Sequence, residues 1–334
     1  MNLAAIDRLR FDDRQPVLSS LYDEIITGLN QTRRTIPPKF FYDETGSKLF
    51  EAICETPEYY PTRTEIAILK ENIDEIEQYI GPDCLLIEPG SGSSHKVRVL
   101  LEAIHPHIYM PLDISGDYLL EVARNLVDEY PGLHVHAGCI DYTVPIDLPA
   151  HPTDLRRVAF FPGSSIGNFE PDEAVSFLSN IAAMVRPDGG LLIGVDLKKD
   201  PAILNAAYND AAGITADFNL NLLERANREL GSDFDPNKFR HSAFYDAAKN
   251  RVEMHLVSQT RQQVHIGRHH FKFAQGESIH TESSYKYTIA EFQALARRAG
   301  FEAIKVWVDT EQLFSVHYFR FASEQPSTLR RSVS

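Results

Sequence analysis

Residues 84–96 read CLLIEPGSGSSHK, and this stretch decides the fold. Its apolar run at 84–88 predicts a short buried strand, and residues 96–104 predict a helix that follows it. Between them lies a glycine-rich turn. Glycines there let a ligand approach the backbone, and the N-terminus of the following helix offers unpaired N–H groups. The stretch therefore predicts a strand–turn–helix unit with a ligand site at its turn.

The alternation of strand and helix continues after this unit. Strands are predicted at 108–112, 133–137, 158–161 and 190–197, and helices at 118–129 and 172–185. Strands connected by helices at this rhythm form a parallel sheet that is covered by helices on both faces. The sequence therefore predicts an α/β fold.

The segments outside this core follow other patterns. Helices are predicted at 19–30 and 47–53, and apolar residues recur at helical spacing from Thr64 onward. Residues 200–230 predict a long helical stretch in which Gly213 is a candidate break. Alternating segments at 242–245, 252–259, 262–266 and 270–273 predict antiparallel hairpins. A helix at 289–299 and an antiparallel strand pair at 303–308 and 313–321 follow, and residues 324–334 are predicted to be disordered.

The composition limits the classes of partner. The 334 residues include 33 Lys and Arg against 47 Asp and Glu, which gives a formal net charge of −14 and disfavours binding to a nucleic acid backbone. Three cysteines without a CxxC pair argue against a disulfide framework or a zinc site. No apolar run is long enough to span a bilayer, and the first residues lack the apolar stretch of a signal peptide. We therefore expect a cytoplasmic enzyme, monomeric and without a membrane partner.

The glycine turn differs from two common nucleotide-binding motifs. His95 occupies the place of the third glycine of GxGxxG, which disfavours a nicotinamide dehydrogenase, and no GK[ST] follows, which excludes a P-loop. Asp113 ends the second predicted strand, where a carboxylate can accept both hydroxyls of a ribose. Asp141 follows the third strand. Because the carboxyl ends of parallel strands meet at one edge of a sheet, these residues predict one cofactor site.

The chain resembles the L-histidine Nα-methyltransferases of ergothioneine biosynthesis, from about Pro37 to about Phe321. The resemblance rests on Glu88 two residues before Gly90, and on the segments PPKFFYDETGSKLFEAICETPEYYPTRTE, FFPGSSIGNFEP, DPAILNAAYNDAAGITADFNLNLLERANRELGSDF and ESIHTESSYKY. It implies three successive methyl transfers from S-adenosylmethionine that convert histidine to trimethylhistidine (hercynine), the first step of that pathway. It also implies a Rossmann-like class I methyltransferase domain at 62–198 and 286–323, and an α+β substrate-binding domain at 8–61 and 199–285.

The resemblance also implies roles for individual residues on the substrate side. Asn168 would hold the α-amino group, and Tyr59 and Tyr208 would grip the carboxylate; these three form the predicted catalytic set. Glu282 and Ser284 would bind the imidazole. The other predicted substrate-binding residues are Tyr42 and Met254.

The resemblance leaves a choice between two adjacent tyrosines and also implies a set of cofactor contacts. Tyr59 is preferred to its neighbour Tyr60, although a slip of one residue stays open at this point. The predicted cofactor-binding residues are Gly90, Lys96, Asp113, Asp141 and Tyr142.

These residue types suit methyl transfer to an amine. The reaction is an in-line attack by a nitrogen lone pair, so the amine must be neutral and aligned, and positioning is the main contribution of the enzyme. The neutral amide of Asn168 tolerates a nitrogen that grows bulkier with each methyl group. Tyrosine hydroxyls donate to a carboxylate without adding a buried charge. Glu282 can accept the imidazole N–H while Ser284 serves the other ring nitrogen.

Three alternatives stay open. An N-methyltransferase of another free amino acid, such as tryptophan, would leave Glu282 facing an apolar indole without a partner. A catalytically silent module that binds S-adenosylmethionine is disfavoured by the joint presence of Asn168, Tyr208, Glu282 and Ser284. The histidines at 265, 269, 270 and 280 invite a metal site, but HxxxHH has no standard ligand spacing, so no metal is expected.

Overall fold

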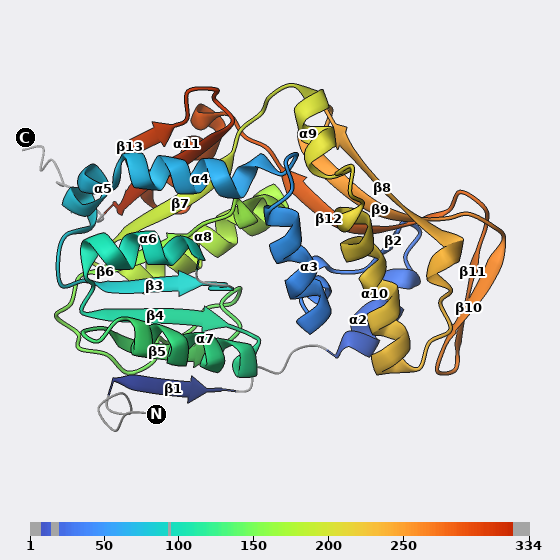
Figure 1. The fold of residues 1–334 in the computed structure, drawn as a ribbon, viewed down its shortest axis with the longest axis horizontal. Helices are drawn as coiled ribbons and strands as arrows, with labels where there is room; N and C mark the ends of the chain where they lie inside the picture. The colour runs from blue at the N-terminus through green and yellow to red at the C-terminus, as the bar shows by residue number, and fades with distance from the viewer. Residues whose placement is uncertain (1–7, 15–19, 93–94, 323–334) are drawn as a thin grey trace, which may run out of the picture.

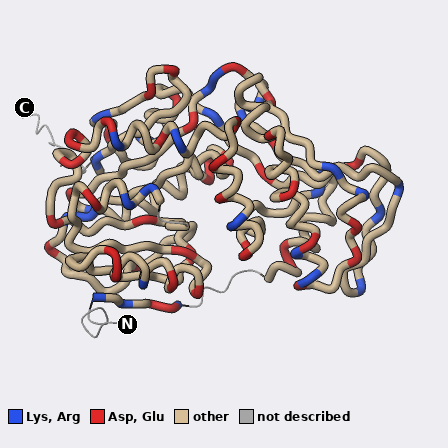
Figure 2. The backbone as a smooth tube through the Cα atoms, in the orientation of Figure 1, with Lys and Arg blue, Asp and Glu red and all other residues tan. Residues whose placement is uncertain are grey.

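The computed structural model describes residues 8–14, 20–92 and 95–322, arranged in two packed parts (Figure 1). One part is a large sheet flanked by helices, and the other contains a smaller sheet with its own helices. The predictions for residue 19 and for residues 324–334 lie outside the described residues. Figure 2 shows Lys and Arg scattered among Asp and Glu over both parts.

The large sheet has eight strands in the order β1-β5-β4-β3-β6-β7-β14-β13. The strands from β1 to β7 in this order are parallel, whereas β14 pairs antiparallel with both β7 and β13. The predicted α/β fold with a terminal antiparallel pair is confirmed. The strands are β1 (Leu9–Asp13), β3 (Leu85–Pro89), β4 (Ile108–Asp113), β5 (His134–Cys139), β6 (Arg157–Phe161), β7 (Gly190–Asp196), β13 (Phe301–Val308) and β14 (Phe314–Phe321).

Helices cover both faces of this sheet because its central strands are apolar on both sides. Leu86 and Ile87 are consecutive in β3, so they point to opposite faces, and both are fully buried. Leu86 belongs to a core shared with α4, α5, α6 and α7, and Ile87 to a core shared with α8 and α11. The helices are α4 (Tyr60–Glu71), α5 (Ile73–Ile80), α6 (His95–Ile104), α7 (Gly116–Glu129), α8 (Pro171–Val185) and α11 (Ile289–Arg298).

The smaller sheet has four strands in the order β2-β12-β9-β8. Three of them form an antiparallel meander, and β2 joins the edge parallel to β12. Helices pack on this sheet over an aromatic core in which Phe41 stacks on Phe218 at 4.4 Å. The elements are α2 (Leu21–Leu29), β2 (Arg34–Thr35), α3 (Glu44–Cys54), α9 (Pro201–Ala207), α10 (Ile214–Leu230), β8 (Phe239–Asp246), β9 (Arg251–Ser258), β12 (Ser278–Tyr285), the hairpin β10 (Gln262–Ile266) and β11 (His269–Phe273), and the 3-10 turns η1 (Pro38–Phe41), η2 (Ser165–Asn168) and η3 (Pro236–Lys238).

β1 is a strand that the sequence pattern does not indicate. It pairs along its whole length with β5 at the edge of the large sheet. Residues 9–13 therefore belong to that sheet and not to the substrate-binding domain predicted at 8–61. Only Leu9 and Phe11 in this strand are apolar, which is too short a pattern to distinguish from a polar connector. The rest of the domain division stays a prediction.

β12 is also absent from the strands predicted above. Its sequence, SIHTESSY, is polar, yet Thr281, Glu282, Ser283 and Ser284 are all buried. A burial pattern read from sequence counts apolar residues, so a strand with a polar interior face does not stand out.

Two predicted helical stretches are each divided in the structure. The first is interrupted at Asn72, whose side chain donates to the carbonyl of Ile68. The second is interrupted at 208–213, which ends at Gly213 with a φ of +78°, as its candidate break predicts. No helix in the described ranges has the length and apolar character that a membrane span requires.

Ile193→Ala tests the packing of β7. Its side chain is fully buried between the sheet and α8, so the truncation is expected to lower the free energy of unfolding by about 2–5 kcal/mol. Ile203→Ala is the matched control, because Ile203 is 40% exposed on α9, and it should change stability by less than about 0.5 kcal/mol. Urea denaturation followed by circular dichroism measures both. Equal losses would contradict this placement of β7.

Candidate active site

A cavity lies where the loops after β6 and β7 face the second part of the molecule. Its walls come from segments far apart in the sequence: the loop after β6, the end of β7, strands β9 and β12, and helices α3 and α10. All of the predicted substrate residues line this one cavity: Tyr42, Tyr59, Asn168, Tyr208, Met254, Glu282 and Ser284.

Strand register explains why three of these side chains point the same way. Glu282 pairs directly with Met254 across β12 and β9, so the two share a face of the sheet. Ser284 follows Glu282 by two residues and lies on that face as well. The smaller sheet thus presents a carboxylate, a hydroxyl and a thioether to the cavity.

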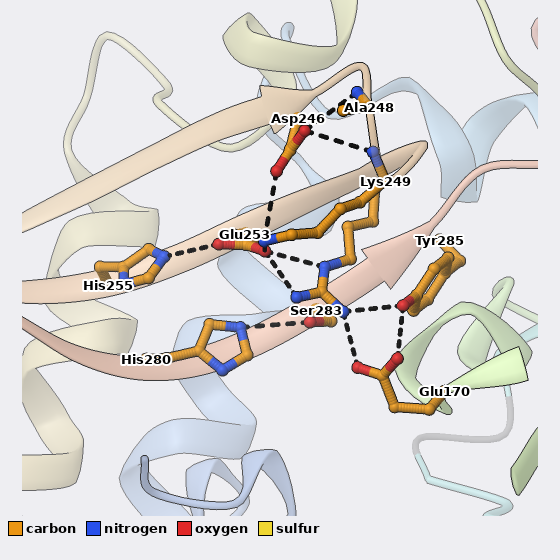
Figure 3. Close-up of polar contacts among 10 residues, drawn as sticks. Glu170, Asp246, Ala248, Lys249, Glu253, His255, His280, Ser283 and Tyr285 are labelled. Carbon is orange, nitrogen blue, oxygen red and sulfur yellow. Dashed lines mark hydrogen bonds and ion pairs between the residues drawn. The ribbon is translucent and has the colours of Figure 1, made fainter. Parts of the chain in front are cut away.

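A polar latch of Arg251, Glu170 and Tyr285 joins the start of α8, two residues after Asn168, to β9 and β12 (Figure 3). The Arg251 guanidinium donates to Glu170 Oε1 at 2.6 Å and to Tyr285 Oη at 2.7 Å, and Tyr285 Oη donates to Glu170 Oε2 at 2.5 Å. Glu170 caps α8 directly after η2, the turn that ends in Asn168. A Cβ on Gly167 would lie 2.7 Å from the Tyr285 carbonyl oxygen, so only glycine allows this approach.

The two adjacent tyrosines have different environments. The Tyr59 ring lines the cavity and packs edge-on against Tyr208, with 6.4 Å between ring centroids. The Tyr60 hydroxyl donates to Asp196 Oδ1 at 2.7 Å and is itself contacted by Lys199. Tyr59 is therefore the member of the pair that faces the cavity.

Sequence reasoning missed a buried charge cluster at one wall of the cavity. Asp196, at the end of β7, forms ion pairs with Lys199 at 2.5 Å and with Lys286 at 2.7 Å, and all three side chains are 6% exposed or less. Burial alone would raise the pKa of Asp196, but the two ammonium groups hold it below its usual value. A signal was present, because the apolar strand GLLIGVD ends directly in the charged residues DLKK.

The predicted cofactor residues gather at the carboxyl ends of β3, β4 and β5. Gly90 has a φ of +69°, and a Cβ there would lie 2.7 Å from the Tyr142 hydroxyl, so this turn needs glycine. Within the described chain, the buried Ser91 Oγ has no hydrogen-bond partner. A polar ligand seated on this turn would supply one.

The two aspartates of the cofactor set differ in their surroundings. Asp113 Oδ1 accepts the backbone N–H of Ser115 at 2.9 Å, and burial raises the pKa of this carboxyl. Asp141 Oδ1 accepts both the N–H and the hydroxyl of Thr143, at 2.9 and 2.6 Å. Each aspartate is thus fixed by the loop that follows its strand.

Lys96 lies between the two sites. Its ammonium forms an ion pair at 2.6 Å with Glu65, which is fully buried and which sequence reasoning missed. The same carboxylate accepts the backbone N–H of Gly163 at 2.9 Å. A Cβ on Gly194 would lie 1.9 Å from Glu65 Oε1, so β7 leaves room for this carboxylate only with glycine. Glu65 therefore joins α6, the loop after β6 and β7.

His280 does not lie with the other histidines considered for a metal. His265 and His270 contact each other on the hairpin, whereas His280 lies beside His255. Glu253, His255 and His280 place potential ligand atoms within 4.8 Å of one another (Figure 3). Glu253 Oε1 already accepts from Lys249 and Arg251, and these cations lower its pKa to about 2 against the effect of burial. A divalent cation there would add charge to a carboxylate that is already neutralised.

Burial disfavours the ionised form of the Glu282 side chain. Burial raises its pKa to about 7, and the nearby Lys286 only partly offsets this effect. The folded protein therefore binds a proton at Glu282 more readily than the unfolded chain does. Its contribution to stability falls as the pH rises from about 4.5 to about 7, and the resulting penalty persists at higher pH.

Glu282→Gln is expected to stabilise the protein at alkaline pH. A shift of this size corresponds to about 3 kcal/mol, so at pH 8.5 the variant should unfold at a higher temperature than the wild type, and the gain should shrink toward pH 5. Glu311→Gln, at an exposed glutamate, is the matched control. Thermal unfolding across this pH range measures the effect. A gain in unfolding temperature that does not depend on pH would show that the titration of Glu282 is not its cause.

Comparison with known proteins matches nearly the whole chain to one family. Residues 21–321 fit the family model described as "Histidine-specific methyltransferase, SAM-dependent". Histidine N-alpha-methyltransferase of Mycobacterium tuberculosis is 39% identical over 296 residues, which cover 87% of this chain and 91% of that protein.

Two fungal relatives are more distant. Ergothioneine biosynthesis protein 1 of Neurospora crassa is 32% identical over 82% of this chain, which spans 32% of that longer protein. The 4-dimethylallyltryptophan N-methyltransferase of Claviceps fusiformis is 28% identical over 88% of this chain and 90% of that protein. With the family model matched over residues 21–321, the chain belongs to the histidine-specific, S-adenosylmethionine-dependent methyltransferases.

Proposed function

We propose that this protein transfers methyl groups from S-adenosylmethionine to the α-amino nitrogen of L-histidine. Three successive rounds give trimethylhistidine (hercynine), the first step of ergothioneine biosynthesis. Membership of the family supports this function, as do the names of the M. tuberculosis and N. crassa relatives. The main supporting observation is one cavity that is lined by Asn168, Glu282 and Ser284. Tyr59 and Tyr208 line the same cavity.

The residues at the carboxyl ends of β3, β4 and β5 fit S-adenosylmethionine. The glycine cradle under Tyr142 and the unpartnered Ser91 hydroxyl suit a polar ligand that lies close to the backbone. Asp113 is positioned to accept ribose hydroxyls, as the carboxylate at this strand end does in related folds. When bound, S-adenosylmethionine supplies an electrophilic methyl group on sulfur. The residues that would hold it are Gly90, Lys96, Asp113, Asp141 and Tyr142.

The cavity can bind both ends of the acceptor amino acid. Tyr59 and Tyr208 offer hydroxyls for the carboxylate, which avoids burying a further cation against it. Glu282, as a carboxylate, accepts the imidazole N–H, and Ser284 donates to the other ring nitrogen. An apolar ring in this place would leave two buried polar groups without partners, at a cost of about 1–3 kcal/mol each.

Asn168 completes the set at the α-amino nitrogen. The nitrogen must be neutral and aligned for attack, and a neutral amide holds it without stabilising the protonated form as a carboxylate would. The latch of Arg251, Glu170 and Tyr285 and the close approach of Gly167 to Tyr285 flank Asn168, so the amine site adjoins the strand that carries Glu282. These residues therefore contribute alignment and exclusion of water, with little proton transfer.

Mass spectrometry of a reaction with histidine and S-adenosylmethionine tests this function directly. We expect products heavier by one, two and three methyl groups, with the trimethylated form at completion. Tryptophan is included as the competing acceptor, because the C. fusiformis relative is named as an N-methyltransferase of a tryptophan derivative. Methylation of tryptophan in preference to histidine would replace the proposed acceptor, and no methylated amino acid from a panel of acceptors would contradict the enzyme assignment.

Asp113→Ala and Glu282→Ala separate the two ligand sites. Asp113→Ala should weaken S-adenosylmethionine binding by about tenfold or more and leave histidine binding nearly unchanged, because it removes hydrogen bonds to a charged group on the cofactor side only. Glu282→Ala should raise the Kd for histidine by a similar factor with cofactor affinity preserved. Titration calorimetry with each ligand measures both variants. Equal losses for both ligands in either variant would show that the two sites are not divided in this way.

A further inference from the structure

Lys286 is a buried lysine at the cavity that the roles above do not use. It follows β12 directly, and its side chain is 1% exposed. Its ammonium lies 2.7 Å from Asp196 Oδ2, donates to Ser284 Oγ at 2.9 Å, and donates to Tyr208 Oη at 3.2 Å. The ammonium therefore has one ion-pair partner and two hydroxyl partners.

The direction of these hydrogen bonds is fixed by chemistry. An ammonium group has three donors and no acceptor, so the oxygens of Ser284 and Tyr208 must accept from Lys286. The proton of each hydroxyl must then point away from Lys286. Both residues line the cavity and lie close to each other, so a ligand there can take the hydroxyl protons that Lys286 directs away from itself.

Asp196 keeps Lys286 charged in this buried place. Burial alone would lower the pKa of Lys286, but the ion pair with Asp196 raises it above its usual value. Lys199 binds the other carboxylate oxygen of Asp196 and makes no hydrogen bond to Ser284 or Tyr208 within the described structure. The two lysines thus share one anion but differ in their contact with the cavity hydroxyls.

Two hydroxyls whose protons point away from Lys286 favour a ligand that accepts hydrogen bonds at these two places. A donor at Tyr208 suits a carboxylate, which only accepts. A donor at Ser284 suits a ring nitrogen without a proton, and Glu282 suits the ring N–H. Together they match the neutral imidazole of a free amino acid that keeps its carboxylate. A ligand without the carboxylate leaves the Tyr208 hydroxyl unpaired.

We propose that Lys286 is a positioning residue that sets substrate specificity, by holding the hydroxyls of Tyr208 and Ser284 as donors toward the cavity. It restricts the acceptor to a free amino acid with a carboxylate and a side-chain nitrogen that accepts a hydrogen bond. This inference rests on the proposed function, because it assigns the two hydroxyls to the acceptor.

Binding of histidine and histamine tests it, since histamine keeps the imidazole and amine but lacks the carboxylate. Titration calorimetry in the presence of S-adenosylhomocysteine gives both Kd values without turnover. The wild type should bind histidine more tightly than histamine, and Lys286→Met should reduce this preference by about tenfold or more, with S-adenosylhomocysteine affinity unchanged. Lys199→Met is the matched control, which removes the other lysine on Asp196 and should retain the preference.

The outcomes separate the inference from the proposed function. An unchanged preference in Lys286→Met, or equal losses in both lysine variants, would overturn the role of Lys286. Production of methylated histidine by the wild type is measured separately, so the function can hold while this inference fails. Lys286→Ala with added methylammonium gives an independent reading. Recovery of histidine binding by methylammonium, and not by sodium chloride at equal ionic strength, supports the donor role, and a folded variant without recovery contradicts it.

Discussion

The arrangement of the site depends on one buried carboxylate, Asp196, at the carboxyl end of β7. It is compensated by Lys199 and Lys286, and Tyr60 donates to it as well. These partners come from the start of α4, from the connection after β7 and from the connection after β12. Removing either lysine would leave the buried carboxylate of Asp196 only partly neutralised, which destabilises the folded protein. The cluster therefore holds the smaller sheet to the end of the larger one.

Much of the large sheet could be predicted because its residues are buried by a regular pattern. Apolar strands such as β3 and β7 alternate with amphipathic helices, and this rhythm indicates a parallel sheet without further information. The sequence pattern does not predict β1 and β12, because each lacks that pattern for a different reason. β1 is a short edge strand of mixed polarity, whereas β12 is buried but polar. The side chains that make β12 suitable for binding also hide it from a search for apolar strands.

The cofactor residues of the site could be predicted from the sequence pattern, whereas the substrate residues could not. The glycine turn and Asp113 follow from where parallel strands end. Asn168, Tyr208 and Glu282 had no such local signal, and each taken alone reads as an ordinary turn, core or surface residue; the family resemblance alone singled them out. Lys286 and Glu65 could not be found by either route. Glu65 contacts Gly163, which is 98 residues away in the sequence, and Lys286 contacts Tyr208, which is 78 residues away, so only the tertiary structure brings these partners together.

Glu65 has a consequence for how the two ligands communicate. One carboxylate contacts the ammonium beside the glycine turn and also the backbone just before Asn168. A ligand that draws Lys96 toward itself weakens one of these contacts and so changes the balance of forces on the other. Such coupling is reciprocal: whatever factor the first ligand applies to the affinity of the second, the second returns to the first. A shared anion can thus make the affinity for each ligand depend on the other without any large movement of the chain, and this coupling by itself favours neither order of binding.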